Sequence, residues 1–277
     1  MSAATEPKTA VKPAKPTPKG TLGALPVYPL VAVLVVVTIY FVSQIAAASL
    51  IQAAPGLSNL SGDSAGLQFG YVLLVEALTL GALYWFMKGR NITFANLGLV
   101  RPRLRDLGAT LLAYPPYFFL NAIATLGAAA LFHLNTEQQQ QTGFENAKSV
   151  SELALTFVSL VVLPPLVEEI VMRGFLFGGL KNGMKVVWAA LLTSLIFAIA
   201  HLQFGNDAPL LWLAAIDTFV LSLVLCYLRQ KTGSLWAGIG LHAAKNGIAF
   251  VVLFIAPQHF WDWHWGSMLL TWTPWTQ

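Results

Sequence analysis

Charged residues are scarce in this sequence. Only 10% of its 277 residues are Asp, Glu, Lys or Arg, whereas 56% are hydrophobic. Because soluble domains typically carry about 25% charged residues, water is not the main solvent of this chain. Its net charge is +4, but the basic residues lie in short clusters between apolar runs and not on a solvated face, so no nucleic-acid partner is expected.

Cysteine is almost absent as well. The single Cys226 lies inside an apolar run, which excludes an intramolecular disulfide framework and a cysteine-based zinc site. Redox chemistry is therefore not expected.

In place of charge, the sequence has a series of apolar runs. A bilayer core about 30 Å thick needs roughly 20 mainly apolar residues per helix. Runs near this length cover residues 27–51, 67–87, 107–134, 153–180, 186–202, 209–228 and 235–255. The first run is longer than a signal-peptide core and has no obvious cleavage pattern, so we expect it to be retained. The sequence thus predicts an all-α, multi-pass transmembrane bundle of about seven spans in the cell membrane.

The two ends of the chain differ from these spans. Residues 1–26 are rich in Lys and Pro and cannot bury enough apolar surface to order themselves, so we predict a disordered tail. Residues 257–277 contain five tryptophans, whose rings favour the headgroup region, and are predicted to form an interfacial tail. Between them lie N-terminal helices and loops in 27–149 and a more polar helical core in 150–256.

Basic residues alternate between the connections of these spans. One set of connections carries the four tail lysines, Lys88, Arg90, Arg101, Arg103, Arg105, Lys181, Lys185, Arg229 and Lys231. The other set carries Asp63, Glu137, Glu145, Lys148 and Asp207. The positive-inside rule then predicts a cytoplasmic N-terminus and a C-terminus on the opposite side.

The 153–180 run contains three charged residues within six positions, Glu168, Glu169 and Arg173. Burying a charge at bilayer depth costs free energy, so each charged residue is expected to have an oppositely charged partner or a functional role. Glu169 and Arg173 are four residues apart, the spacing of a same-face ion pair, and we expect them to support the site structurally. Glu168 points elsewhere, because adjacent helical residues differ by about 100° around the axis. We expect Glu168 to face a cavity as a general base.

Pro164 and Pro165 stand immediately before this cluster. Proline lacks the backbone N–H that a helix needs, and membrane helices tolerate it when neighbouring groups satisfy the freed carbonyls. We therefore expect a distorted helix here.

Two later runs supply further polar side chains. His201 ends the 186–202 run, and helix lengths place it within about 7 Å of the level of Glu168 on an antiparallel neighbour. His242 and Asn246 are four residues apart and share a helix face. The four residues suit catalysis in which Glu168 and His201 activate water while His242 and Asn246 donate to an oxyanion. Glu168, His201 and His242 would equally suit a divalent metal such as zinc.

Three motifs in order, Glu168-Glu169-x-x-x-Arg173, Phe197-x-x-x-His201 and His242-x-x-x-Asn246, resemble the CPBP family. These are the CAAX protease and bacteriocin-processing enzymes, also called the ABI family. The resemblance covers residues 150–256 and implies a helical intramembrane endopeptidase core with the four catalytic roles given above. It also implies membrane lipid and a peptide or protein substrate, in some members a prenylated CAAX-type one, as partners. Family members are commonly labelled metalloproteases, and the sequence leaves metal dependence open.

Other intramembrane charges are Glu76, Asp217 and Lys245, and an Asp217–Lys245 pair between adjacent helices is one expectation. Two other functions stay open. A non-catalytic scaffold or bacteriocin-immunity-type protein would keep the polar cluster for stability. A transporter would use Glu76, Glu168, Asp217 and the histidines as a relay, but it predicts repeated halves, and the sequence has no such symmetry.

Overall fold

The computed structural model describes residues 23–54, 56, 64–135, 142–203 and 210–256. Its elements are α1 (Pro29–Ala53), α2 (Ala65–Lys88), α3 (Leu104–Phe132), α4 (Val150–Phe157), η1 (Val158–Val162), α5 (Leu163–Glu168), η2 (Glu169–Leu176), α6 (Phe177–Leu180), α7 (Val186–Ala200), α8 (Trp212–Thr232), α9 (Trp236–Phe250) and η3 (Val251–Ile255). The η segments are π-helical turns. These residues contain no strand, and the predicted all-α fold is confirmed.

The number of spans also agrees with the sequence. Among the described residues, six helices are long and apolar enough to cross a bilayer, with α4 to α6 forming one helix, Val150–Leu180, and α7 is a seventh, shorter apolar helix. The predicted ends shift by a few residues; the 107–134 run, for example, forms Leu104–Phe132. The Trp-rich tail 257–277 and residues 1–22 of the Lys/Pro-rich tail lie outside the described residues.

Residues at the helix ends explain where two of the helices begin or end. Ser149 caps α4: its Oγ accepts from the backbone N–H of Glu152 at 3.2 Å, and the Glu152 carboxylate accepts from the Ser149 N–H at 2.9 Å. This reciprocal pair satisfies two of the free donors at a helix start. Gly233 ends α8 with φ of 70°, a left-handed conformation that glycine adopts at little cost.

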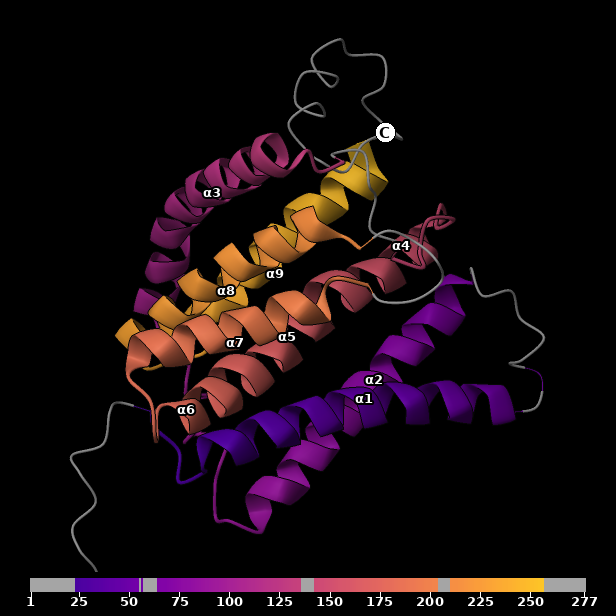
Figure 1. Cartoon of the computed structure of the whole chain (residues 1–277). Helices are drawn as coiled ribbons and strands as arrows, with labels where there is room; N and C mark the ends of the chain where they lie inside the picture. Colours follow the sequence, from indigo (N-terminus) through magenta and orange to yellow (C-terminus); the bar gives the residue numbers. More distant parts are fainter. Residues whose placement is uncertain (1–22, 55, 57–63, 136–141, 204–209, 257–277) are drawn as a thin grey trace, which may run out of the picture.

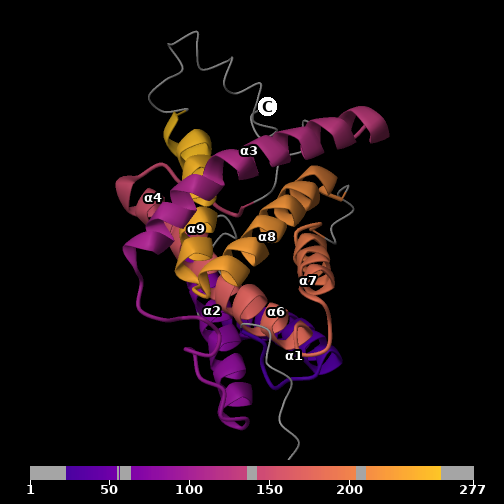
Figure 2. The same cartoon turned by 90° about the vertical axis from the view of Figure 1, so that its left-hand side faces the viewer.

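Helix α8 lies at the centre of the bundle. It is 61% buried over its apolar window, against 11–28% for the other five long helices. It packs against α3, α7 and α9 (Figure 2), while α1 and α2 pack on each other and on the α4–α6 helix at the far side (Figure 1). Large exposed apolar side chains such as Trp85 and Leu112 lie on the outer helices, where lipid can cover them.

Basic connections meet at one end of the bundle. Arg105, at the start of α3, donates to the Thr232 carbonyl at 3.3 Å, and Lys181 donates to Gln230 Oε1 at 3.0 Å. The Leu235 N–H donates to the Gly98 carbonyl at 2.9 Å. The basic clusters that the sequence places on alternate connections are therefore neighbours in space.

This arrangement leads to a labelling prediction. Cys226 is the single cysteine and is buried, so a cysteine placed on the surface is the accessible thiol. In intact cells, a membrane-impermeant maleimide should label Lys148→Cys but label Lys231→Cys only after permeabilisation, because the positive-inside rule places Lys231 in the cytoplasm. The reverse pattern would contradict the predicted orientation.

Candidate active site

The Val150–Leu180 helix changes its winding on both sides of α5. Segments η1 and η2 are π-helical, and the Leu163 N–H donates to the Val158 carbonyl across the first of them. Each π turn accommodates an extra residue and rotates the side chains that follow, and such turns are frequent at functional sites. The winding change sets the direction of Glu168 and Glu169, which lie at the junction of α5 and η2.

A proline pair leaves one carbonyl of this helix without a backbone donor. The Leu160 carbonyl would accept from residue 164 in an α-helix and from residue 165 in a π-helix, and both are proline. Asn246 on α9 supplies the missing hydrogen, because its Nδ2 donates to the Leu160 carbonyl at 2.9 Å. Asn246 therefore joins α9 to η1 directly.

The predicted ion pair of the second glutamate is present. Glu169 Oε1 and Arg173 Nη1 are 2.8 Å apart, and both side chains are almost completely buried. The Arg173 guanidinium also lies over the Phe197 ring of α7, with 4.4 Å between its carbon and the ring centroid. On the other side, a Cβ at Gly238 of α9 would lie 2.8 Å from Glu169 Oε2. The ion pair is thus enclosed between α7 and α9.

His242 on α9 contacts both glutamates. Its Nδ1 is 3.4 Å from Glu169 Oε1, and its Nε2 is 3.7 Å from Glu168 Oε2. Because Glu169 Oε1 also accepts from Arg173, donation from His242 Nδ1–H to this oxygen is the favourable assignment, which leaves Nε2 facing Glu168. The two glutamates therefore differ in role: one orients the imidazole, and the other lies at its free nitrogen.

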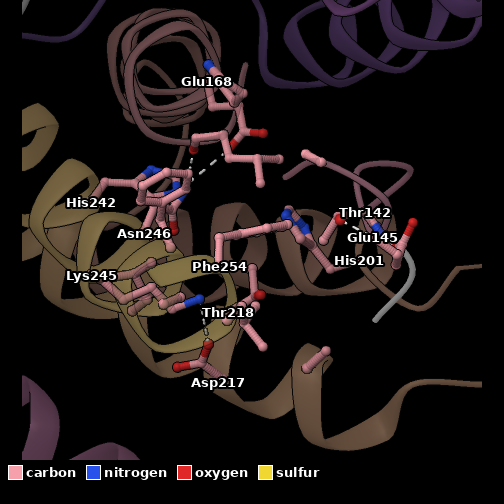
Figure 3. A pocket seen from close by; sticks show the side chains of 18 of the residues that line it. Thr142, Glu145, Glu168, His201, Asp217, Thr218, His242, Lys245, Asn246 and Phe254 are labelled. Carbon is pink, nitrogen blue, oxygen red and sulfur yellow. Dashed lines mark hydrogen bonds and ion pairs between the residues drawn. The ribbon is translucent and has the colours of Figure 1, made fainter. Parts of the chain in front are cut away.

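His201 lies on another side of the same site. Its Nδ1 is 2.9 Å from the Phe197 carbonyl, which makes Nδ1 the protonated nitrogen and leaves Nε2 as an acceptor. Figure 3 places His201 near Thr142 and Glu145, across from the facing pair Glu168 and His242. Among the described residues, no hydrogen bond or ion pair joins His201 to Glu168. The direct neighbour of Glu168 is His242.

A cavity of about 770 Å³ brings the four predicted catalytic residues together. Its lining includes Glu168, His201, His242 and Asn246, together with apolar side chains of α8 and α9 and the 142–148 loop. Glu168 Oε2 is buried and has no hydrogen-bond partner, although the carboxylate side chain as a whole is 28% exposed. Glu76 does not line this cavity. The cavity extends towards the 142–148 loop, away from the basic end.

The wall of the cavity contains a second polar group. Lys245 Nζ and Asp217 Oδ2 are 2.9 Å apart, which confirms the pair expected from sequence. Tyr117 on α3 donates from its hydroxyl to Asp217 Oδ1 at 2.7 Å. Sequence reasoning missed Tyr117, because one tyrosine in an apolar run is common and carries no signal.

The 142–148 loop at the cavity rim contains a carboxylate, Glu145, that is bound by backbone N–H groups of the same loop. The Glu145 carboxylate accepts from the backbone N–H groups of Thr142 and Gly143 at 2.6 and 3.1 Å. Burial raises the pKa of Glu145, but backbone hydrogen bonds outweigh burial and hold this pKa below its ordinary value. Sequence reasoning assigned Glu145 and Lys148 only to topology, and both line the cavity.

The side chains do not fit the metal alternative. Across the described residues, no group of three or more His, Cys, Asp or Glu side chains is arranged to hold an ion. The bond from His201 Nδ1 to the Phe197 carbonyl leaves Nε2 available to an ion, but among the described residues no hydrogen bond or ion pair places His201 beside Glu168. The set Glu168, His201 and His242 is therefore not assigned as a zinc site.

Comparison with known proteins agrees with this geometry. Residues 150–248 match the family described as type II CAAX prenyl endopeptidase Rce1-like. This segment is similar to the Rce1-like family. The match confirms the resemblance to CAAX proteases and covers all three motifs, so Glu168, His201 and His242 all lie within the Rce1-like segment.

One curated relative is an uncharacterized 24.3 kDa protein of Escherichia coli. It is 33% identical over 109 residues, which are 37% of this chain and 47% of the relative. The chain thus spans about half the length of the curated relative that it matches. No solved structure matches the chain significantly.

The Asn246 contact can be tested by a double-mutant cycle. We expect Asn246→Ala to lower the free energy of unfolding by about 1–3 kcal/mol, because the part-buried Leu160 carbonyl loses its donor. In the Pro164→Ala background the loss should be smaller, since residue 164 regains a backbone N–H that can reach Leu160. Thermal melting in detergent measures both. Equal losses in the two backgrounds would contradict this role of the proline pair.

The close approach of α9 can be tested at Gly238. Gly238→Ala would place a methyl group 2.8 Å from the Glu169 carboxylate, and we expect it to destabilise the fold by about 1–3 kcal/mol. Gly247→Ala on the same helix is the control, because its Cβ would lie 3.6 Å from Val161 Cγ1, an ordinary contact. Comparable melting temperatures for the two variants would argue against a tight Gly238 site.

Proposed function

We propose that this multi-pass membrane protein is an intramembrane endopeptidase that hydrolyses a peptide bond of a membrane-associated substrate. One observation carries the proposal: Glu168 presents a buried carboxylate oxygen without a hydrogen-bond partner to a cavity that it shares with His201, His242 and Asn246. Glu169 Oε2 also has no hydrogen-bond partner, but Glu169 is paired with Arg173 and does not line the cavity, whereas Glu168 does. The match of residues 150–248 to the Rce1-like family model supports the same activity.

In the proposed mechanism, Glu168 is the general base. It removes a proton from a water molecule as the water oxygen bonds to the scissile carbonyl carbon, and it returns the proton to the leaving amine as the C–N bond breaks. His201 Nε2 accepts the second hydrogen of the water, since Nδ1 is fixed by the Phe197 carbonyl. Water activation thus uses two acceptors on opposite walls of one cavity.

His242 and Asn246 are proposed to stabilise the oxyanion of the tetrahedral intermediate. In this step His242 takes up a second proton from solvent at Nε2, so that the ring donates from Nδ1 to Glu169 and from Nε2 to the oxyanion, and it releases this proton when the intermediate collapses. A side-chain amide carries two donor hydrogens, so Asn246 retains one when the other is bound to Leu160. Glu169 and Arg173 act through His242, as a support that fixes its ring.

The proposed substrate is an apolar or lipid-tethered peptide. Leu221, Phe250, Leu253 and Phe254 line the cavity beside the polar residues, and such a lining favours apolar side chains over charged ones. The family description names CAAX prenyl endopeptidases. We extend that description to this chain as a proposal, with a prenylated peptide as the substrate to test first.

The test is cleavage by purified protein of a synthetic CAAX peptide with and without a farnesyl group on its cysteine. Glu168→Gln keeps the size of the side chain but removes the base, and we expect a loss of at least about 100-fold in kcat. Mass spectrometry of the products gives the rate and the cleaved bond.

Glu152→Gln is the matched control on the same helix. Gln also serves in the Ser149 capping box, so this variant should cleave as the wild type does. Full activity of folded Glu168→Gln protein would rule out the mechanism. An inactive wild type with both peptides would instead favour a scaffold role for the polar cluster.

A further inference from the structure

A second cavity, of about 440 Å³, lies at the basic end of the bundle, away from the proposed peptidase site. Its walls come from the 23–26 segment before α1, from the turn after α2, and from the end of α8. Asn91, Asn96 and Arg229 are its polar side chains. None of these residues takes part in the proposed hydrolysis.

Arg229 is a buried cation without a counter-ion in the described part of the chain. It is 4% exposed, its Nε has no hydrogen-bond partner, and no described carboxylate forms an ion pair with it. The end of α8 favours a positive charge through the helix dipole, but this effect is small beside the cost of burying a guanidinium. The charge therefore lacks the compensation that buried arginines normally have.

The backbone around Arg229 is shaped to admit the guanidinium. A Cβ at Gly98 would lie 2.5 Å from its Cζ, and a Cβ at Gly23 would lie 3.0 Å from its Nη2. Both glycines have positive φ, 93° and 74°, a conformation that L side chains rarely adopt. The segments that contain Gly23 and Gly98 thus have no side chain at the positions next to the guanidinium.

A second cation approaches the same place. The Cβ position of Gly23 lies 3.3 Å from Lys181 Nζ as well as 3.0 Å from Arg229 Nη2. Burial, and then repulsion by Arg229, lower the pKa of Lys181 to about 8. Two positive groups are therefore held together at a bundle end, where an added anion would relieve their repulsion.

We propose that this cavity binds a phosphate group, with the Arg229 guanidinium as its main ligand. Guanidinium binds phosphate oxygens through paired, charge-assisted hydrogen bonds, and it remains charged when buried. The phosphate can come from a lipid headgroup, because the cavity lies at the level where the spans end, or from a soluble phosphate. The site would tie α8 to the loops before α1 and after α2.

The test uses the purified full chain in detergent and three probes: dioctanoyl phosphatidylglycerol, dioctanoylglycerol without phosphate, and inorganic phosphate. Calorimetric titration and native mass spectrometry measure binding. We expect the wild type to bind the phospholipid and not dioctanoylglycerol. Arg229→Gln should weaken this binding by about tenfold or more, as expected for loss of a charge-assisted contact.

Arg101→Gln is the matched control, because it removes one positive charge at the same end from an exposed side chain outside the cavity. It should bind as the wild type does. If inorganic phosphate saturates the site and phosphatidylglycerol does not bind, the ligand is a soluble phosphate. If phosphatidylglycerol binds and inorganic phosphate does not, the ligand is a lipid headgroup.

A second variant covers the case in which Arg229→Gln does not fold. Asn96 Oδ1 accepts from the Thr93 N–H and hydroxyl, each at 2.8 Å, and Asn96→Asp retains these acceptors while adding a negative charge to the cavity wall. It should weaken phosphate binding and leave the melting temperature unchanged. Unchanged binding in Asn96→Asp, or equal losses in Arg101→Gln and Arg229→Gln, would overturn the proposal, as would a wild type that binds no phosphate probe.

Discussion

The ion pair between Glu169 and Arg173 is the constraint on which the arrangement of the site depends. Two charges inside a membrane bundle are costly unless they stay paired, so the groups that enclose this pair must stay in place. Phe197 covers the guanidinium, and His242 and Gly238 adjoin the carboxylate. The pair thereby fixes the spacing of three helices and the plane of one imidazole.

The proline pair has an effect that complements this ion pair. Removing backbone donors from the Val150–Leu180 helix creates the need for an outside donor, and Asn246 meets it. Helix winding, side-chain direction and interhelical contact are therefore connected at one place. A helix with ordinary residues at positions 164 and 165 would satisfy its own carbonyls and would not require α9.

Sequence spacing predicted those parts of the site that depend on a single helix or on charge. The i, i+4 spacing predicted the Glu169–Arg173 pair, and the cost of intramembrane charge predicted the partnership of Asp217 and Lys245. Pro164 and Pro165 predicted a distorted helix, but spacing did not predict that the distortion takes the form of π-helical turns. It also could not show that His242, and not His201, is the direct neighbour of Glu168, since this depends on helix rotation and tilt.

The hydrogen bond from Asn246 to Leu160 also limits how a substrate can reach Glu168. Opening the seam between η1 and α9 would expose a bare carbonyl and a bare amide to hydrocarbon, where no water replaces the lost contact. Separating η1 from α9 would therefore be costly, and the proposed substrate would have to enter along a different edge of the bundle. The 142–148 loop, which precedes the Ser149 cap of α4, lines the same cavity at a different edge.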